Sequence, residues 1–450
     1  MQRPTLFFLH SLGASRDEWQ DVIATLEPRF ECVALDIPGF GTTPSAGRLD
    51  VIALADWFCA QVADRAPPCW FAIGHSMGGK IATLAAARSR DGMLGLAGLG
   101  GVVLLAASPP SPEPMDSARR AEMLAWFGSG APQRQHAETF VDNNTASVLP
   151  PALRERAIAD VLRSQPEAWA AWLLRGSRQD VADAAGTLHV PALIVAGGED
   201  GDLGEDAQRR LNLPHYPVAT LERVAGAAHL LPYEAPHDVA RLIALQVEHS
   251  QTRRLPDDFM RLLNSNRVVP AMRSRLLQRH AGPAPDARGV LSDGQRAVLA
   301  ALSAAVLDGH ADGHDLARRM DIALANEEGD GWRFADLPAD VAAWQTGLDI
   351  LQQMDFGDVP ASDQAALLTA IARGEHPLAP ESAFSAAQLA HWFEDVRATV
   401  VRTWTSLPST FALMGYDGFA VGGDGRDSLG YTHTEADQGD DWQLCGTRSC

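Results

Sequence analysis

The feature that most constrains the fold of this chain is an alternation of short apolar runs with longer amphipathic stretches over its first 250 residues. Segments such as residues 80–89 and 239–247 have the apolar spacing of helices. Strands that are apolar on both faces and separated by helices indicate a parallel sheet covered on both sides. The pattern therefore predicts an α/β fold with a mostly parallel, doubly wound sheet. Its expected strands, rich in β-branched or aromatic residues, are residues 6–10, 30–36, 69–74, 101–108, 192–197 and 219–224.

One interval interrupts this alternation. Residues 110–186 contain no convincing strand and have the pattern of helices after a Ser- and Pro-rich start. Because an insertion after the C-terminal end of a strand commonly covers a site, we expect a helical cap here. Within it, His136 and Arg175 are candidates to bind a substrate carboxylate. Its aromatic rings either dock the cap on the core or line a pocket: Trp126, Phe127, Phe140, Trp169 and Trp172.

The remaining 200 residues have a different character. Residues 1–250 are expected to form one domain, and residues 251–290, which include Arg253 and Arg254, an Arg-rich helical connector and linker. Residues 291–421 show helical spacing and no comparable strand pattern, which predicts a separate α-helical domain. The sequence from residue 291 onward is acidic, with 25 Asp and Glu against nine Arg and no Lys. Residues 422–450 are rich in Gly and Asp and are expected to be loop or disordered.

Charge and composition exclude several classes of function. The formal net charge of −20 disfavours nucleic acid as a partner, because a duplex-binding surface needs clustered Lys and Arg. No apolar run is long enough for a membrane span, and no signal peptide is recognisable, so we expect a cytoplasmic protein, with export alongside a partner left open. Five cysteines do not make a disulfide framework, and Cys445 and Cys450 lack the nearby second pair of a zinc site.

The sequence Gly-His-Ser-Met-Gly at residues 74–78 lies between a predicted strand and a predicted helix. A nucleophilic serine at a sharp strand-to-helix turn needs small neighbours, because the backbone passes close to itself there. The N-terminus of the helix also directs free N–H groups toward developing negative charge. Ser76 is therefore the candidate nucleophile.

Partners for this serine follow in the order that a catalytic triad requires. A serine hydroxyl needs a base, and the base must be held in one tautomer by an acid. Asp200 ends a predicted strand and turn, and His229 follows the next strand. Both positions are at C-terminal strand ends, where open α/β sheets place their sites. The competing residues are Glu199, Asp202 and His237.

A triad also needs two backbone donors for the oxyanion that forms during acyl transfer. One is expected to be the N–H of Met77, directly after the nucleophile. The other is expected to be the N–H of Leu12, in the loop after the first strand.

With these motifs in place, residues 1–250 resemble the lid-bearing α/β-hydrolase superfamily, of the esterase and enol-lactonase type. The resemblance rests on His-Ser-Leu-Gly at 10–13, Asp-Ile-Pro-Gly-Phe-Gly at 36–41, Gly-His-Ser-Met-Gly-Gly at 74–79, Gly-Gly-Glu-Asp at 197–200 and His229. It implies a hydrolase of small carboxylic esters or lactones with Ser76, Asp200 and His229 as its triad. A cofactor-free lyase of the menaquinone pathway uses the same triad, and the motifs do not separate the two. The family usually has Gly where this chain has Ser11, so we expect a small shift of the oxyanion loop.

Residues 291–421 resemble subunit 3 of the flavin-dependent gluconate 2-dehydrogenases, through segments 291–296, 364–374 and 392–418. That resemblance implies a flavoprotein dehydrogenase as partner, with Trp392, Trp404 and Tyr416 either facing it or forming helical core. A Gly-x-Gly-x-x-Gly fingerprint is missing, so this chain itself is expected to bind no flavin, and no other cofactor or metal is expected. The fusion suggests that a sugar lactone made by the dehydrogenase is the substrate. The alternative is an accessory subunit whose hydrolase fold is not catalytic.

Overall fold

The structure, a computed structural model, describes residues 3–45, 47–127, 132–217, 219–250, 255–283, 287–329 and 331–419. It divides into two compact units. One contains the described residues up to Gln278 and those from Gly415 onward, and the other is Arg279–Met414. The predicted tail at 422–450, with Cys445 and Cys450, and the connector residues Arg253 and Arg254 lie outside the described residues.

Six parallel strands form the sheet of the first unit, in the order β2-β1-β3-β4-β5-β6. They match the six predicted strands and confirm the predicted fold class. The largest shift is in β4, which starts two residues early, where Gly100 and Gly101 leave room for the ring of Phe71, and ends before Ala106, whose φ is +38°. The strands are β1 Thr5–Leu9, β2 Glu31–Leu35, β3 Trp70–His75, β4 Leu99–Leu105, β5 Ala192–Gly197 and β6 Ala219–Val224.

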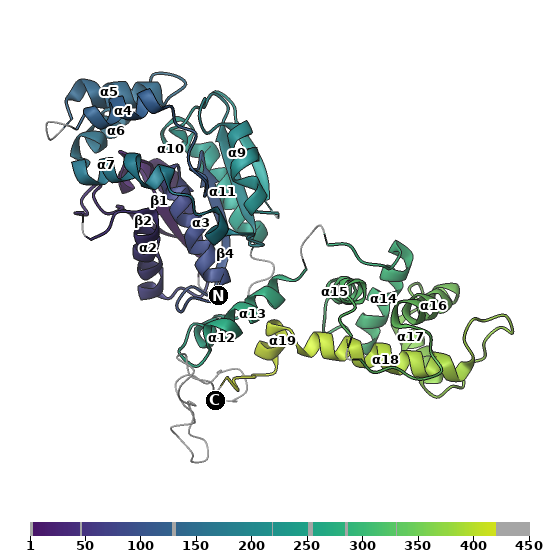
Figure 1. The fold of residues 1–450 in the computed structure, drawn as a ribbon. Coiled ribbons are helices and arrows are strands. Elements are labelled where there is room, and N and C mark those ends of the chain that lie inside the picture. The colour runs from purple at the N-terminus through teal and green to yellow at the C-terminus, as the bar shows by residue number, and fades with distance from the viewer. Residues whose placement is uncertain are drawn as a thin grey trace, which may run out of the picture. The chain divides into compact units, whose positions relative to one another are not determined.

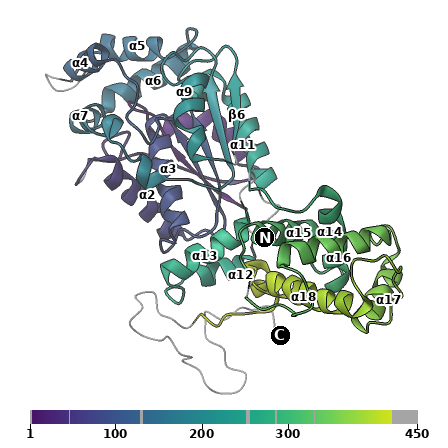
Figure 2. The same cartoon turned by 45° about the vertical axis from the view of Figure 1, so that its right-hand side comes forward.

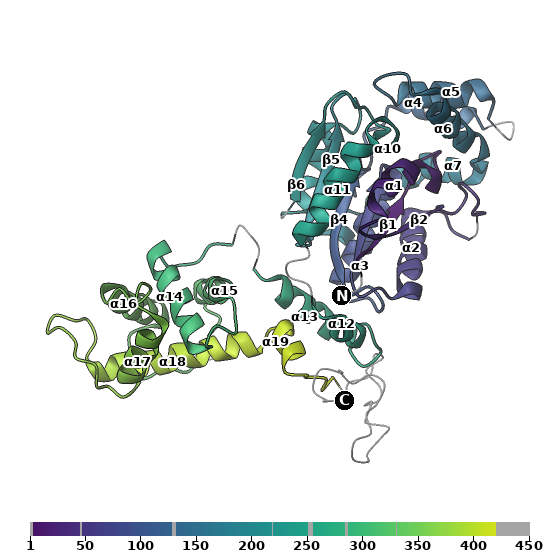
Figure 3. The same cartoon turned by 180° about the vertical axis from the view of Figure 1, so that it is seen from behind.

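Helices cover both faces of this sheet. Helices α2 (Val51–Arg65) and α3 (Met77–Arg90) pack on one face, visible in Figure 1, and α1 (Gln20–Leu26) and α11 (Pro236–Ser250) pack on the other, visible in Figure 3. Alternate strand residues supply the two cores. In β1, Phe7 and Leu9 belong to the α2 and α3 side, and Leu6 and Phe8 to the α1 and α11 side.

Between β4 and β5 the chain forms a group of helices that lie together at one end of the first unit (Figures 1 and 2). We call this group the cap. The cap helices are α4 Ser117–Ala125, α5 Arg134–Asn143, α6 Pro151–Arg163 and α7 Pro166–Leu174, followed by η2 Gly176–Arg178. Helix α8, Ala182–Ala185, lies instead beside Arg90, the last residue of α3, whose guanidinium donates to the carbonyl of Ala185 at 2.6 Å. Many of its aromatic residues are core: Trp169 is fully buried and stacks on Phe127, with their ring centroids 4.6 Å apart.

Shorter elements complete the first unit. Asn264 pairs with the backbone N–H and carbonyl of Ala97, and the buried Arg273 donates to the carbonyls of Leu263 and Gly92. These contacts fix the two helices that follow α11 to the sheet domain. The shorter elements are η1 Arg16–Trp19, α9 Glu205–Leu211, η3 Leu213–His215, α10 Leu231–Glu234, α12 Asp257–Leu263 and α13 Pro270–Ala281.

The described residues of the second unit form helices joined by loops, without a strand, and have a hydrophobic core of their own. Trp392 is at its centre, fully buried against Gly347, and Trp404 packs partly buried at the edge of the same core. Both rings are therefore helical core. No helix in the described parts of either unit is long and apolar enough to cross a membrane. The second unit's helices are α14 Asp293–Val306, α15 Gly313–Ala325, α16 Asp340–Gln353, α17 Ala361–Ala372, α18 Ala386–Thr405 and α19 Pro408–Leu413.

Candidate active site

Ser76 occupies the single residue between the end of β3 and the start of α3, in a strained backbone conformation with φ +48° and ψ −114°. The turn closes because its neighbours are glycines. A Cβ on Gly74 would lie 2.5 Å from the carbonyl oxygen of Gly78, and one on Gly78 would lie 2.3 Å from that of Leu9. The predicted sharp turn is therefore present, and it presents the serine at the C-terminal end of a central strand.

The structure brings Ser76, His229 and Asp200 together in one hydrogen-bonded chain. Nε2 of His229 is 2.9 Å from Oγ of Ser76, and Nδ1 of His229 is 2.8 Å from Oδ2 of Asp200. The three side chains come from the loops after β3, β6 and β5, so the parallel sheet delivers all of them to one edge. This is the arrangement in which a histidine can take a proton from a serine.

The environment of Asp200 keeps this carboxyl ionised. Burial alone would raise its pKa, but the charge and hydrogen bond of His229 outweigh that effect and lower the pKa to about 2. The N–H groups of Asp202 and Leu203 help by donating to Oδ1, at 3.0 and 3.1 Å. Burial alone would lower the pKa of His229, but Asp200, with smaller contributions from Glu113 and Glu18, raises it.

The residues that compete with this assignment in the sequence have other contacts. Glu199 lies 3.7 Å from Arg223, and Asp202 pairs with Arg119 at 2.5 Å. His237 is exposed in the first turn of α11. Only Asp200 among these acids contacts His229 in the described part of the chain.

The loop that carries His229 is held from two directions. The carbonyl of Asn144, in the cap, accepts hydrogen bonds from the N–H groups of His229 and Leu230, both at 3.1 Å. Glu234 accepts from the N–H groups of Ala146 and Ala228, at 2.6 and 2.9 Å. The cap therefore contributes directly to the position of the candidate base.

Above Ser76 lies a pocket of about 180 Å³ between the cap and the strand ends. Its lining combines apolar and polar side chains and includes both Ser76 and His229. The apolar part comes largely from the cap, and the polar part includes four acidic side chains. Its principal lining residues are Leu12, Met115, Met123, Phe140, Trp172, Leu230, Ser11, Glu113, Arg119, Asn143, Asn144, Glu199, Asp200 and Asp202.

Two charged pocket residues, Glu113 and Arg119, were not singled out by the sequence, because neither belongs to a motif. Glu113 accepts a hydrogen bond from Ser108 at 2.9 Å, and burial raises its pKa.

The candidates proposed for binding a carboxylate do not line the pocket. His136 stacks on Trp126, and Arg175 is exposed.

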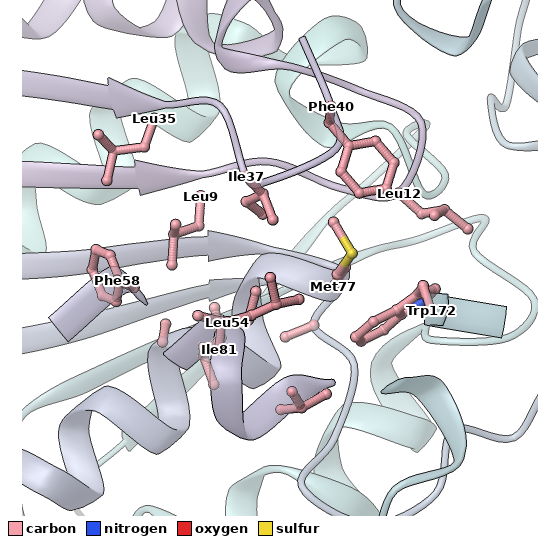
Figure 4. Close-up of a cluster of buried hydrophobic side chains, with 14 of the residues drawn as sticks. Leu9, Leu12, Leu35, Ile37, Phe40, Leu54, Phe58, Met77, Ile81 and Trp172 are labelled. Carbon is pink, nitrogen blue, oxygen red and sulfur yellow. The ribbon is translucent and has the colours of Figure 1, made fainter. Parts of the chain in front are cut away.

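The two predicted oxyanion donors are positioned near the serine. Leu12 lines the pocket, and Met77 is the first residue of α3, whose N–H has no partner within the helix. Their side chains belong to one buried cluster with Trp172, drawn in Figure 4. Among the described residues, no carbonyl accepts a hydrogen bond from the N–H of Leu12. The described residues also contain no cluster of His, Cys, Asp and Glu that fits a metal ion.

The first half of the chain is similar to several known proteins. The pimeloyl-[acyl-carrier protein] methyl ester esterase of Neisseria meningitidis serogroup B is 28% identical over 237 residues, which cover 51% of this chain and 88% of that protein. Among solved structures, an enol-lactonase from Burkholderia xenovorans is 18% identical and has a TM-score of 0.47. Its match covers 55% of this chain and 92% of the enol-lactonase. An esterase from Exiguobacterium antarcticum is 14% identical and has a TM-score of 0.49. Its match covers 54% of this chain and 92% of the esterase.

The model of the family described as "Alpha/beta hydrolase family" matches residues 6–242. This match includes all of the sheet except Thr5, the cap, and the residues from Ser76 to His229. Because it covers more than half of the sequence, the chain belongs to the alpha/beta hydrolase family.

Proposed function

We propose that this protein is a serine hydrolase that cleaves a small carboxylic ester through an acyl-enzyme. The observation that carries the proposal is the continuous hydrogen-bonded chain from Asp200 through His229 to Ser76, at the floor of a pocket. The curated relatives, which are named as methyl ester esterases, support the same class of reaction.

In the first half of the reaction, Nε2 of His229 takes the proton of Ser76 Oγ as that oxygen attacks the ester carbonyl carbon. Asp200 holds the imidazole in the tautomer with a proton on Nδ1 and stabilises the imidazolium that forms. The N–H groups of Leu12 and Met77 are proposed to donate to the tetrahedral oxyanion. As the intermediate collapses, the imidazolium returns its proton to the leaving alkoxide, and the alcohol departs.

In the second half, a water molecule repeats the sequence on the acyl-enzyme. His229 takes one proton from water, the resulting hydroxide attacks the acyl carbonyl, and Ser76 leaves with that proton restored to Oγ. The products are one carboxylic acid and one alcohol, so a single water molecule balances the reaction. A lactone would give a single hydroxy acid by the same steps.

The test is labelling of the full chain with a fluorophosphonate probe, followed by peptide mapping. We expect the probe on Ser76, no labelling of a Ser76→Ala variant, and loss of nearly all hydrolysis of a simple methyl or aryl ester in that variant. No labelling of the folded wild-type chain would instead favour the accessory, non-catalytic alternative. Labelling without turnover of any ester would favour the cofactor-free lyase.

The relatives and the second unit suggest different substrates for this site. The relatives' names favour methyl esters of acyl chains as the first substrates to assay. The resemblance of residues 291–421 to gluconate 2-dehydrogenase subunit 3 supports the narrower proposal that the substrate is a sugar lactone supplied by a partner flavin dehydrogenase. Aldonolactones that open at the uncatalysed rate, while methyl esters are cleaved, would remove the lactone proposal. Co-purification of a flavoprotein with the full chain tests the partner.

A further inference from the structure

A second carboxylate–imidazole pair, formed by Glu18 and His75, lies buried beneath the proposed triad. Both side chains have no exposed surface, and Nδ1 of His75 is 2.8 Å from Oε1 of Glu18. Glu18 belongs to η1, which follows the oxyanion loop, and His75 directly precedes Ser76 in the chain. The pair thus joins two segments that the proposed chemistry requires.

Each end of this pair is hydrogen-bonded to a further residue. Ser11 donates its hydroxyl proton to Oε2 of Glu18 at 2.8 Å, so the oxyanion loop is attached to one end. At the other end, Nε2 of His75 is 2.7 Å from the backbone carbonyl oxygen of His229. Since a carbonyl oxygen only accepts, Nε2 carries the proton and donates. The rings of His75 and His229 lie 5.3 Å apart.

Glu18 acts in this arrangement as an ionised acceptor. Burial alone would raise its pKa, but the charge and hydrogen bond of His75, with smaller contributions from His10 and Ser11, lower it instead. A carboxylate that accepts from Nδ1 of His75 fixes the ring plane, and so fixes the direction of the Nε2–H bond toward His229. Such a charge-assisted bond is stronger than one between neutral groups.

Stability alone is a weak reason for this pair to exist. Taking two charges out of water is expensive, and replacing a buried pair with apolar side chains of similar volume is often neutral or stabilising. The pair does, however, connect the loops after β1, β3 and β6, which carry Leu12, Ser76 and His229. We infer that Glu18 and His75 are positioning residues that hold the backbone of His229 in register with the nucleophile turn and the oxyanion loop.

The inference rests on the proposed function and is tested on the full chain with an ester that the wild type cleaves. The variant His75→Phe keeps the ring volume but removes the donor to His229. We expect kcat and the rate of fluorophosphonate labelling to fall about 10- to 100-fold, because small displacements of reacting groups have effects of that size. KM is expected to stay within about twofold, because neither residue lines the pocket.

Since His75→Phe leaves Glu18 buried without its partner, a second variant keeps the test decisive if this one does not fold. In Glu18→Leu/His75→Phe the unpaired charge is gone, and we expect a folded protein with the same loss of kcat. Glu18→Gln retains an amide oxygen that can accept from His75, and its loss of kcat is expected to be smaller than that of the double variant.

The matched control is Asp36→Asn. Asp36 is also a buried carboxylate after a strand, and it accepts from the N–H groups of Arg16 and Thr42, but it has no contact with the triad. We expect this variant to lower Tm while kcat stays within about threefold of the wild type. A folded His75 variant with wild-type kcat would overturn the inference. An unlabelled, inactive wild type would overturn the proposed function itself, so the two failures are distinct.

Discussion

The backbone carbonyl of Asn144 accepts a hydrogen bond from the N–H of His229 at 3.1 Å. A residue at the end of cap helix α5 therefore holds the candidate base, although 85 residues separate the two along the chain. The side chain of Asn144 is itself fixed, because its amide donates to the carbonyl of Phe140 at 2.6 Å and its oxygen accepts from Arg119 at 3.2 Å. The cap thus helps to build the triad as well as to cover it.

Removing the side chain of Asn144 is therefore expected to affect catalysis. In Asn144→Ala the carbonyl loses its local anchors, and we predict a fall in kcat of about tenfold from misplacement of His229. Asn143→Ala is the control, because Asn143 lines the same pocket without bonding the His229 loop. Steady-state kinetics on one neutral ester compare them. Equal kcat values in the two variants would contradict this role of the cap.

The assignment of Asp200 can be tested against its neighbour in sequence. Asp200→Asn replaces the acceptor for Nδ1 of His229 with an amide and favours the wrong tautomer, so we predict a loss of roughly 10⁴ in kcat. Glu199→Gln removes an acid one residue away that contacts Arg223 instead. Its kcat on a neutral ester should stay within about twofold of the wild type. A comparable loss in both variants would argue against Asp200 as the orienting acid.

The pH dependence follows from the raised pKa of His229. The base must be neutral to accept the serine proton, so kcat/KM should be lost as pH falls through a midpoint above the ordinary histidine value of 6.5. Burial opposes this rise, Asp200 is its largest cause, and Glu113 adds to it. In Glu113→Gln the midpoint should therefore move to lower pH. A pH profile with a midpoint unchanged by this substitution would contradict the contribution of Glu113.

Much of the fold and of the candidate site could be predicted from the sequence, because both depend on local signals. Apolar runs bounded by turn residues located all six strands, and each proposed triad residue lies in the loop that follows one of them. The tight turn at Ser76 is visible in its flanking glycines. In β4, by contrast, the first residues include Gly100 and Gly101, which are not typical of a strand. They are glycines because the ring of Phe71, from the neighbouring strand, occupies the space that a Cβ would need.

The pairings that the sequence did not indicate join residues that are distant along the chain. Glu18 and His75 are 57 residues apart, and Arg119 and Asp202 are 83 apart. Nothing in the local pattern distinguishes such a pair from two surface residues. The candidates in the cap also differ from the expectation: His136 is in α5 and Arg175 directly follows α7, but neither lines the pocket.

A stability prediction concerns Lys80, a buried lysine in the first turn of α3. Its ammonium donates to the carbonyls of Ser111 and Gln179, at 3.1 and 2.6 Å, where the chain enters and leaves the cap. Burial lowers its pKa from 10.5 to about 8. Between these values the unfolded chain binds more protons than the folded one, so this lysine should make the free energy of unfolding increase as pH rises from 8 to 10.5.

Over this pH range, the lowered pKa of Lys80 corresponds to an increase of roughly 3 kcal/mol in the free energy of unfolding. Other groups titrate in the same range, so the comparison is with Lys80→Met, which removes the contribution of this lysine to the pH dependence along with its two hydrogen bonds. The free energy of unfolding is measured with urea at pH 7.5 and at pH 9.5. Between these pH values it should increase more, or decrease less, for the wild type than for the variant. A difference between the two proteins that is independent of pH would contradict the lowered pKa of Lys80.

The charges of the pocket predict which esters the site prefers. Glu113, Glu199, Asp200 and Asp202 line it against one arginine, Arg119, whose guanidinium is already paired with Asp202. A substrate carboxylate would therefore meet net negative charge and would have to displace Asp202. We predict that kcat/KM for the 4-nitrophenyl ester of valeric acid exceeds that for the mono-4-nitrophenyl ester of glutaric acid by at least about tenfold, which corresponds to about 1.4 kcal/mol.

Two substitutions separate a general charge effect from the specific pairing of Arg119. Glu199→Gln and Asp202→Asn each remove one negative charge from the pocket, but only Asp202→Asn also frees Arg119 to bind a carboxylate. The ratio of kcat/KM for the neutral ester to kcat/KM for the anionic ester should decrease in both variants. The decrease should be larger in Asp202→Asn, mainly because KM for the anionic ester is lower. Added salt should narrow the preference of the wild type, because it screens exposed charges. Equal narrowing in the two variants would show that Arg119 does not select substrates, and no preference in the wild type would exclude electrostatic selection by this pocket.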